Sequence, residues 1–249
     1  MSFWQWFKYI SLVVFRPGSI VRKEWQMLIY LNRDRKDFAL PPLVMQEDLR
    51  YVAKKHSRDM AKKDYFAHEN FRGQSPADRL KVSRVTDSVS GENLAKIGGY
   101  PQVVQEAEEG LMRSPGHRAN ILNKMYNCVG IGIIKSKDGV FYFTQNFAKR
   151  VLKFFSKIRK VISIEHGLRL KGVAIEDVSQ IYYQVKEHGG TRMIGKGVID
   201  LDESGEFDAR VKISETGRYE VSLFVPTRGK KMARVNHFDV RVRKWWFWR

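Results

Sequence analysis

Residues 114–122, SPGHRANIL, decide how the first half of this chain folds. Ser114 is a favoured helix N-cap residue and Pro115 suits a first helical position, so the stretch predicts a helix that begins here. His117 then lies in the first turn, where the positive end of the helix dipole lowers its pKa. A neutral imidazole at this place suits a metal ligand or a general base.

Helical patterns lie upstream of this stretch. Residues from Glu47 to Lys63 place apolar side chains at steps of three and four, with Lys and Arg opposite, which predicts a helix. Gly73 and Pro76 then mark a loop beside His68, and Pro101 opens a second helix that runs to Arg113. The helix before the quoted stretch and the helix inside it are therefore neighbours in the chain.

Two apolar runs follow the stretch, Val129 to Ile134 and Val140 to Phe147, and Lys137-Asp138-Gly139 joins them as a hairpin. Helix, loop, helix, helix and hairpin within about 125 residues predict an α+β domain, with helices packed on a small, largely antiparallel sheet. Cys128, the single cysteine, begins the first run and is expected to be a small buried hydrophobe.

These residues resemble a known family. Six motifs occur in order: LNRDR with LPPL (31–43), HSRDM (56–60), YFAH (65–68), GENL (91–94), SPGHRANIL (114–122) and VGIG (129–132). Together they resemble a bacterial or archaeal member of the CAP superfamily of cysteine-rich secretory, antigen 5 and pathogenesis-related proteins, also called SCP-like. The resemblance covers about half of the chain.

The resemblance implies an α-β-α sandwich with a central cleft, in which two histidines and one or two glutamates gather and can hold a divalent ion. The matching positions here are His68, Glu92 and His117. Animal members carry a second glutamate three residues after a helical tryptophan. Leu111 stands at that tryptophan position and Ser114 at that glutamate position, so the set of four is incomplete.

Two imidazoles and a carboxylate suit a zinc-like ion with one position left for water or substrate. The alternative is structural, with Glu92 hydrogen-bonding backbone in a sharp turn and His117 bracing its helix. Tyr65, Ser114 and Gln145 are candidates to line the cleft. No catalytic residue can be named, because nothing that resembles an activated nucleophile stands beside these side chains.

Three glutamates in the helix before Ser114, at positions 106, 108 and 109, invite a carboxylate-pair interpretation. A solvated helix face explains them more simply, with Glu108 the one most nearly in line with the apolar Val104 and Leu111.

The second half of the chain changes its pattern. Residues 150–163 are predicted to be a basic amphipathic linker, either a helix that packs between two domains or a segment on an anionic membrane. Short apolar or alternating runs then recur about every dozen residues, which predicts a small antiparallel β-sandwich, immunoglobulin-like in architecture, over 164–249. The first domain spans 24–149.

The chain ends are aromatic. Residues 1–23 are expected to hold an apolar helix, from Phe3 to Phe15, that is too short to span a bilayer and lacks the marks of a cleavable signal peptide. It either lies in a membrane interface or packs on the protein. At the other end, Arg241 to Arg249 sets tryptophans among cations, as an anionic lipid interface favours.

The formal net charge of +18 predicts an anionic partner, either a membrane or a cell-envelope polymer. We expect an extracellular or membrane-associated binding protein whose cleft holds a divalent metal ion or a small apolar ligand. A metal-dependent hydrolase of peptidase type, with Glu92 as general base, is the first alternative. Nucleic-acid binding is the second, and the lack of any reader motif argues against it.

Overall fold

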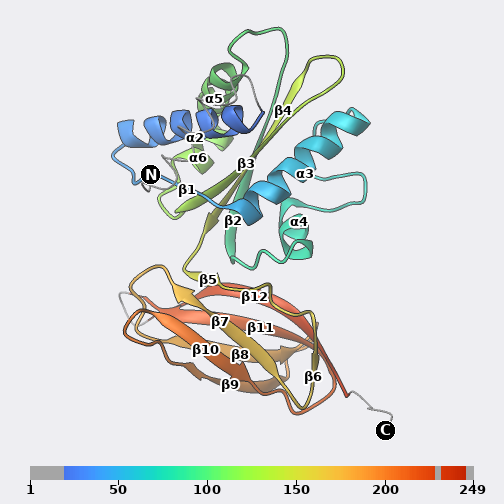
Figure 1. Ribbon diagram of the computed structural model, residues 1–249, viewed down its shortest axis with the longest axis vertical. Helices are drawn as coiled ribbons and strands as arrows, with labels where there is room; N and C mark the ends of the chain where they lie inside the picture. The colour runs from blue at the N-terminus through green and yellow to red at the C-terminus, as the bar shows by residue number, and fades with distance from the viewer. Residues whose placement is uncertain (1–19, 228–230, 245–249) are drawn as a thin grey trace. The chain divides into compact units, whose positions relative to one another are not determined.

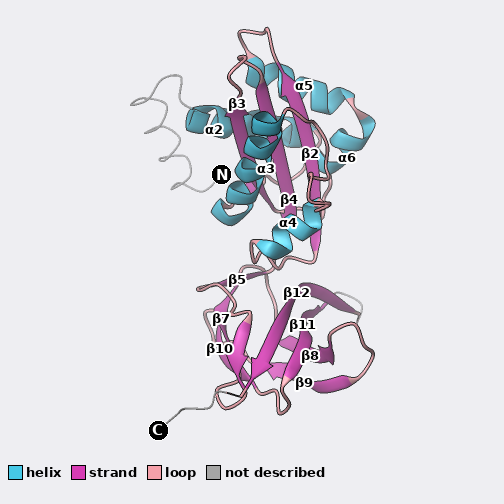
Figure 2. Ribbon diagram, turned by 90° about the vertical axis from the view of Figure 1, so that its right-hand side faces the viewer, coloured by secondary structure: helices cyan, strands magenta, loops and turns pink. Residues whose placement is uncertain are grey.

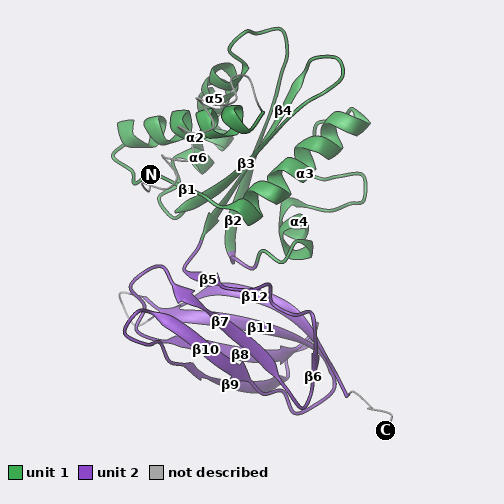
Figure 3. Ribbon diagram, in the orientation of Figure 1, with its two compact units in different colours: residues 1–85, 89–149 green, residues 86–88, 150–249 purple. Residues whose placement is uncertain are grey.

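The computed structural model describes residues 20–227 and 231–244, which divide into two compact units (Figure 3). Unit 1 comprises the chain up to residue 85 together with residues 89–149, and unit 2 comprises residues 86–88 and 150–249. The aromatic segment from Phe3 to Phe15 and the last five residues, 245–249, lie outside the described residues. No helix in the described part is long and apolar enough to cross a bilayer.

Unit 1 mixes helices with a four-stranded sheet (Figure 1). In chain order its elements are α2 (Ile20–Asp37), β1 (Val44–Met45), α3 (Glu47–Lys63), α4 (Pro76–Val82), β2 (Val89–Ile97), α5 (Val103–Arg113), α6 (Pro115–Ile121), β3 (Cys128–Lys135) and β4 (Phe141–Lys149). The strand order is β1-β3-β4-β2, with β1 parallel to β3 and the other pairs antiparallel. β2 is thus an edge strand.

Strand β3 shows why helices cover both faces of this sheet. Val129, Ile131 and Ile133 point to one face, where they pack with apolar residues of α2, α5 and α6. Gly130 and Gly132 point to the other face, where a Cβ atom would lie only 2.1 Å from backbone atoms of α3. Helix α3 therefore packs directly on the strand, and Figure 2 shows the resulting α-β-α sandwich.

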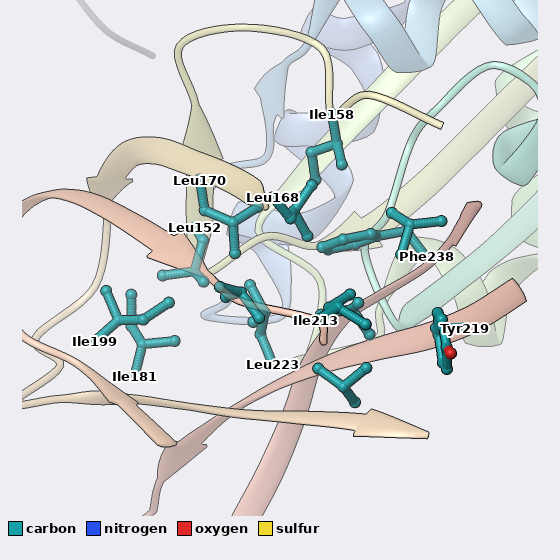
Figure 4. Packing of buried hydrophobic residues seen from close by; sticks show 14 of the residues in the cluster. Leu152, Ile158, Leu168, Leu170, Ile181, Ile199, Ile213, Tyr219, Leu223 and Phe238 are labelled. Carbon is teal, nitrogen blue, oxygen red and sulfur yellow. The ribbon is translucent and has the colours of Figure 1, made fainter. Parts of the chain in front are cut away.

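Unit 2 is a β-sandwich of two sheets. Its strands are β5 (Leu152–Phe154), β6 (Val161–Ser163), β7 (Leu168–Ala174), β8 (Ile181–Glu187), β9 (Met193–Ile199), β10 (Glu206–Val211), β11 (Gly217–Pro226) and β12 (Met232–Arg243). The sheet orders are β10-β7-β5 and β6-β12-β11-β8-β9, antiparallel apart from the short parallel pair of β6 with β12. Leucines, isoleucines and valines from both sheets form one core (Figure 4).

The helical prediction for residues 150–163 was wrong. This segment holds strands β5 and β6, and Val151, Leu152, Ile158 and Ile162 are buried in the core of unit 2. Short apolar runs do not distinguish helix from strand by their spacing, and packing against two sheets decided the outcome.

Residues 86–88, which the sequence assigned to the first domain, belong to unit 2. Ser88 N donates to Val235 O at 3.0 Å and His237 N donates to Thr86 O at 3.0 Å. The buried pair of Asp87 and Arg150, with 2.6 Å between Oδ2 and Nη2, fixes the same short segment. The chain therefore enters unit 2, returns to unit 1 and enters unit 2 again.

Candidate functional site

Glu92 is the centre of the candidate site and lies in the edge strand β2, opposite Asn146 of β4. Its Oε1 is 2.9 Å from Nδ1 of His68, and its Oε2 accepts from Nη2 of Arg79 at 2.5 Å. With its nitrogen turned to this side, the Asn146 amide also donates to Oε2 at 3.1 Å. Both oxygens of a carboxylate that is only 2% exposed are therefore bonded.

Helix α4 positions Arg79 for this role. Ser75 and Asp78 form a capping box at its N-terminus, and Pro76 takes the first helical turn. Arg79 Nη1 then donates to the carbonyl oxygens of His68, at 2.6 Å, and of Gln74. One guanidinium thus fixes the Glu92 carboxylate and the backbone of the His68 loop together.

His68 is held from the loop between α3 and α4, and its side chain is 51% exposed. A carboxylate only accepts, so in the neutral ring Nδ1 carries the proton toward Glu92 and Nε2 keeps its lone pair. The neighbouring residue Ala67 is also fixed, because its carbonyl oxygen is 3.0 Å from Nε2 of the buried His56.

His117 lies in the first turn of α6, as the sequence predicts. Its pKa is lowered from the ordinary value by burial and by the charge of His68. Its backbone carbonyl accepts from Asn93 Nδ2 at 3.0 Å.

Asn93 and Glu92 are adjacent in β2, so their side chains point to opposite faces of the sheet. Glu92 bonds to Arg79 of α4, and Asn93 bonds to the backbone of His117 in α6. The ring of His68 therefore bonds on one face of β2, and the backbone of His117 bonds on the other.

A buried polar chain continues behind Asn93. Asn93 Nδ2 donates to Gln145 Oε1 at 3.1 Å, and Gln145 Nε2 donates to Glu108 Oε2 at 2.7 Å. Asn120 of α6 donates to Asn93 Oδ1 at 2.9 Å. Full burial raises the pKa of Glu108 to about 8, so this acid is protonated at neutral pH.

The solvated face predicted for Glu108 was therefore wrong, although its alignment with Val104 and Leu111 was the signal that it is buried. Arg79 was missed as well. The capping box that begins its helix could have placed it, but nothing in its spacing named Glu92 as its partner.

The three residues suggested as cleft lining have different places. Gln145 belongs to the buried polar chain described above. Ser114 ends α5 and begins α6, and its side chain makes no capping hydrogen bond. Tyr65 donates to Asp59 at 2.7 Å, and its ring lies against that of Phe71 with 4.6 Å between centroids, so its hydroxyl is engaged by Asp59.

A three-ligand metal site would require Glu92 to exchange one of its present partners. In the described part of the chain, no group of three or more His, Cys, Asp or Glu side chains is arranged to hold a metal ion. Glu92 would have to leave Arg79 or His68 to become a ligand, and it points away from the face on which Asn93 meets α6. The metal site of His68, Glu92 and His117 stays a prediction.

Comparison with known proteins agrees with the first unit's motifs. The profile of the cysteine-rich secretory protein family, CAP, matches residues 28–147. The Bacillus subtilis (strain 168) uncharacterized protein YkwD is 35% identical over 131 residues, 53% of this chain and 49% of its own length. The uncharacterized membrane protein YlbC of the same strain is 36% identical over 145 residues, 54% of this chain and 39% of its own length.

This chain thus spans about half or less of each of these relatives. Among solved structures, an extracellular protein containing a SCP domain from Bacillus anthracis str. Ames is 28% identical, with a TM-score of 0.47 over 55% of this chain and 44% of that one. Residues 28–147 form a domain of the cysteine-rich secretory protein (CAP) family, of the prokaryotic type.

Proposed function

We propose that this protein is a non-enzymatic binding protein of a membrane or cell-envelope surface, whose CAP domain offers His68 and His117 to a small ligand. The observation that carries the proposal is the bonding of Glu92, whose Oε1 meets His68 and whose Oε2 meets Arg79. Such a carboxylate orients a neighbour and, at 2% exposure, is closed to solvent.

The same bonding argues against turnover. A general base must lie within hydrogen-bond reach of the proton that it removes and must gain from taking it. Glu92 is buried, and both of its oxygens are already bonded, Oε1 to His68 and Oε2 to Arg79. Its role is to hold the His68 ring in one tautomer, as carboxylates do for histidines that bind ligands.

Two observations support the surface location, the net charge and the similarity to a relative. The net charge of +18 attracts anionic lipid or acidic polymer. A relative that is 36% identical over 145 residues carries the name of a membrane protein, although this chain covers only 39% of it. The basic and aromatic chain ends would add to such binding.

Co-sedimentation with vesicles tests the surface location. The full chain should pellet with phosphatidylglycerol vesicles and remain in solution with phosphatidylcholine vesicles, in both cases at about 0.15 M salt, where weak surface attraction is largely screened. If the same fraction of protein pelleted with the two lipids, the protein would not be selective for an anionic surface, and that part of the proposal would be wrong.

Metal-dependent hydrolysis is the competing function, and one observation favours it. Glu92 occupies Nδ1 of His68 and leaves Nε2 available, while the lowered pKa keeps His117 neutral. Two neutral imidazole nitrogens are good zinc ligands.

Zinc titration by calorimetry, with the wild type and the His68→Ala and His117→Ala variants, separates the two functions. We expect no stoichiometric zinc binding and no peptidase activity in the wild type. Tight binding of one zinc ion that both variants abolish would favour the hydrolase.

A further inference from the structure

A hollow of unit 1, which we call the basic pocket, lies between α3, the loop that follows it and α4, and has a volume of about 340 Å³. Residues 52–83 supply its whole lining. His56 and Arg79 form part of the wall, and these two residues also hold the His68 loop. The pocket therefore adjoins the candidate site without including Glu92 or His117.

Positive charge gathers on one wall of the basic pocket. Lys55, Arg58 and Lys62 recur at steps of three and four on α3, so they share a helix face. Arg72 adds a fourth cation from the loop. Within residues 20–227 and 231–244 none of these four side chains has an acidic partner. Like charges at such spacing repel one another, and an anion would relieve that repulsion.

The one carboxylate of the lining cannot neutralise them. Asp59 accepts from Tyr65 on Oδ2 at 2.7 Å, and its Oδ1 is 2.8 Å from Nζ of Lys63. Both oxygens are therefore committed to other partners. Only an anion that enters from solution can therefore neutralise the four unpaired cations.

The wall keeps unused hydrogen-bonding capacity as well. Arg79 Nε is a buried donor and His56 Nδ1 a buried ring nitrogen, and neither has a hydrogen-bond partner in the described structure. The contact of His56 Nε2 with a carbonyl oxygen makes Nε2 the donor, and burial lowers the pKa of this histidine, so Nδ1 is an acceptor. Both atoms are buried, so a ligand meets them only where these two side chains turn toward the pocket, and it would then carry an acceptor for Nε and a hydroxyl donor for Nδ1.

We propose that the basic pocket binds a phosphate group carried by a hydroxylated molecule, of which glycerol phosphate is the simplest example. A phosphate carries up to two negative charges and several acceptor oxygens, which can be shared among several cations. A carboxylate brings one charge and suits a single guanidinium better. The volume is at the small end of the range for ligand pockets, which fits a head group of this size.

The same chemistry has two sources, a free or polymeric polyol phosphate and a phospholipid head group. The inference deepens the anionic-surface part of the proposed function by naming a site and a ligand class, and it makes no use of the His68 and His117 cleft. Soluble and vesicle-bound probes distinguish the sources.

The experiment compares two triple variants of the full chain with equal charge. The pocket variant carries Lys55→Gln, Arg58→Gln and Lys62→Gln. The control carries Lys36→Gln, Lys124→Gln and Lys137→Gln, which are exposed positions of unit 1 outside the pocket lining. All six side chains are exposed, so both variants should fold, and calorimetric unfolding confirms it.

Binding of sn-glycerol 3-phosphate and of inorganic phosphate is measured by calorimetry, and binding of phosphatidylglycerol vesicles by co-sedimentation. The pocket variant should lose at least about tenfold in affinity for glycerol phosphate, while the control stays within about twofold of the wild type. If the pocket variant loses binding only to the vesicles, and the control does not, the site binds a lipid head group.

The proposal that the basic pocket binds phosphate is overturned if the two variants lose affinity equally, or if the wild type binds none of the three probes. If the wild type pellets with phosphatidylglycerol, and the pocket variant both pellets equally well and binds glycerol phosphate as the wild type does, the pocket is wrong and the surface proposal stands. If glycerol phosphate binds in the pocket but the wild type does not pellet with anionic vesicles, the pocket stands and the anionic-surface proposal is wrong.

Discussion

Arg79 donates from Nη2 to Glu92 Oε2 at 2.5 Å, and both side chains are nearly inaccessible, with 8% and 2% exposed. Removing one partner of a buried pair leaves the other charge uncompensated, which costs about 3–5 kcal/mol. Arg79→Ala should therefore destabilise unit 1 by that amount. Hydrogen exchange in β2, which reports on unit 1 alone, measures the loss.

The exposed pair of Arg113 and Glu109 supplies the control, since exposed ion pairs contribute at most about 1 kcal/mol. If Arg79→Ala cost no more than Arg113→Ala, the buried pair would not hold the site together.

Glu108 predicts a pH dependence of stability. Its pKa in the folded protein is about 8, raised by burial from 4.5. The folded state therefore holds a proton that the unfolded state has released between these values, and the stabilising contribution is full below pH 4.5 and falls as the pH rises toward 8. At ~1.4 kcal/mol per pKa unit, the loss amounts to a few kcal/mol.

Glu108→Gln carries no titrating proton and keeps an acceptor for Gln145. The variant should unfold at a higher temperature than the wild type at pH 8, with a smaller difference at pH 5. A wild type whose stability rose over this range, with Glu108→Gln showing the same rise, would contradict the buried neutral acid.

His117 should titrate below its ordinary pKa of 6.5, because burial disfavours the imidazolium and His68 adds like charge. In His68→Gln the pKa of His117 should rise, but it should stay below 6.5 because the larger cause remains. NMR of the imidazole resonances follows this titration. A His117 pKa above 6.5 in the wild type would mean that an acidic group lies closer than the structure places one.

Two glycines test the packing of helix on sheet. Gly130→Ala would put a Cβ atom 2.1 Å from the backbone of Leu49 and Arg50, so α3 must move away from β3. We expect a loss of about 3 kcal/mol or more in the free energy of unfolding, because overpacking a close contact displaces backbone. Hydrogen exchange in β3 and α3 measures it.

Gly110→Ala is the matched control, because its Cβ would meet nothing nearer than 4.0 Å. In the middle of helix α5 this change should stabilise the protein by about 0.4–1 kcal/mol. Destabilisation of similar size in both variants would point to a general intolerance of alanine and not to the contact with α3.

The sequence predicted the parts of the fold whose patterns are local. The period of Glu47 to Lys63, the proline of α6 and the turn at Gly139 each point to one structure, and each element is present. Strand β2 was missed, because Gly91 and the polar pair Glu92 and Asn93 do not alternate as a half-buried strand does. Their polar side chains are buried by the site itself, and that depends on partners far away in the chain.

The site shows the same division. The motifs named His68, Glu92 and His117 as one set, and the structure bonds His68 to Glu92, but the motifs could not give the face of the sheet on which each bond is made. That face follows from the pleat of β2 and from Arg79, Asn93 and Gln145, which lie on three separate elements. Charge at Lys55, Arg58 and Lys62 was visible in the sequence as the polar face of a helix, and only the neighbouring loop makes it a pocket.

The three residues at 86–88 also have a consequence for proteolysis. Since Thr86 and Ser88 exchange backbone hydrogen bonds with β12, a protease that cut the chain once between Lys149 and Arg150 would not separate the two units. The larger fragment would carry its own short length of the sandwich, and the two fragments would copurify until denatured. To express unit 2 alone, residues 86–88 should therefore be kept with the sandwich, for example by joining them to it through a linker.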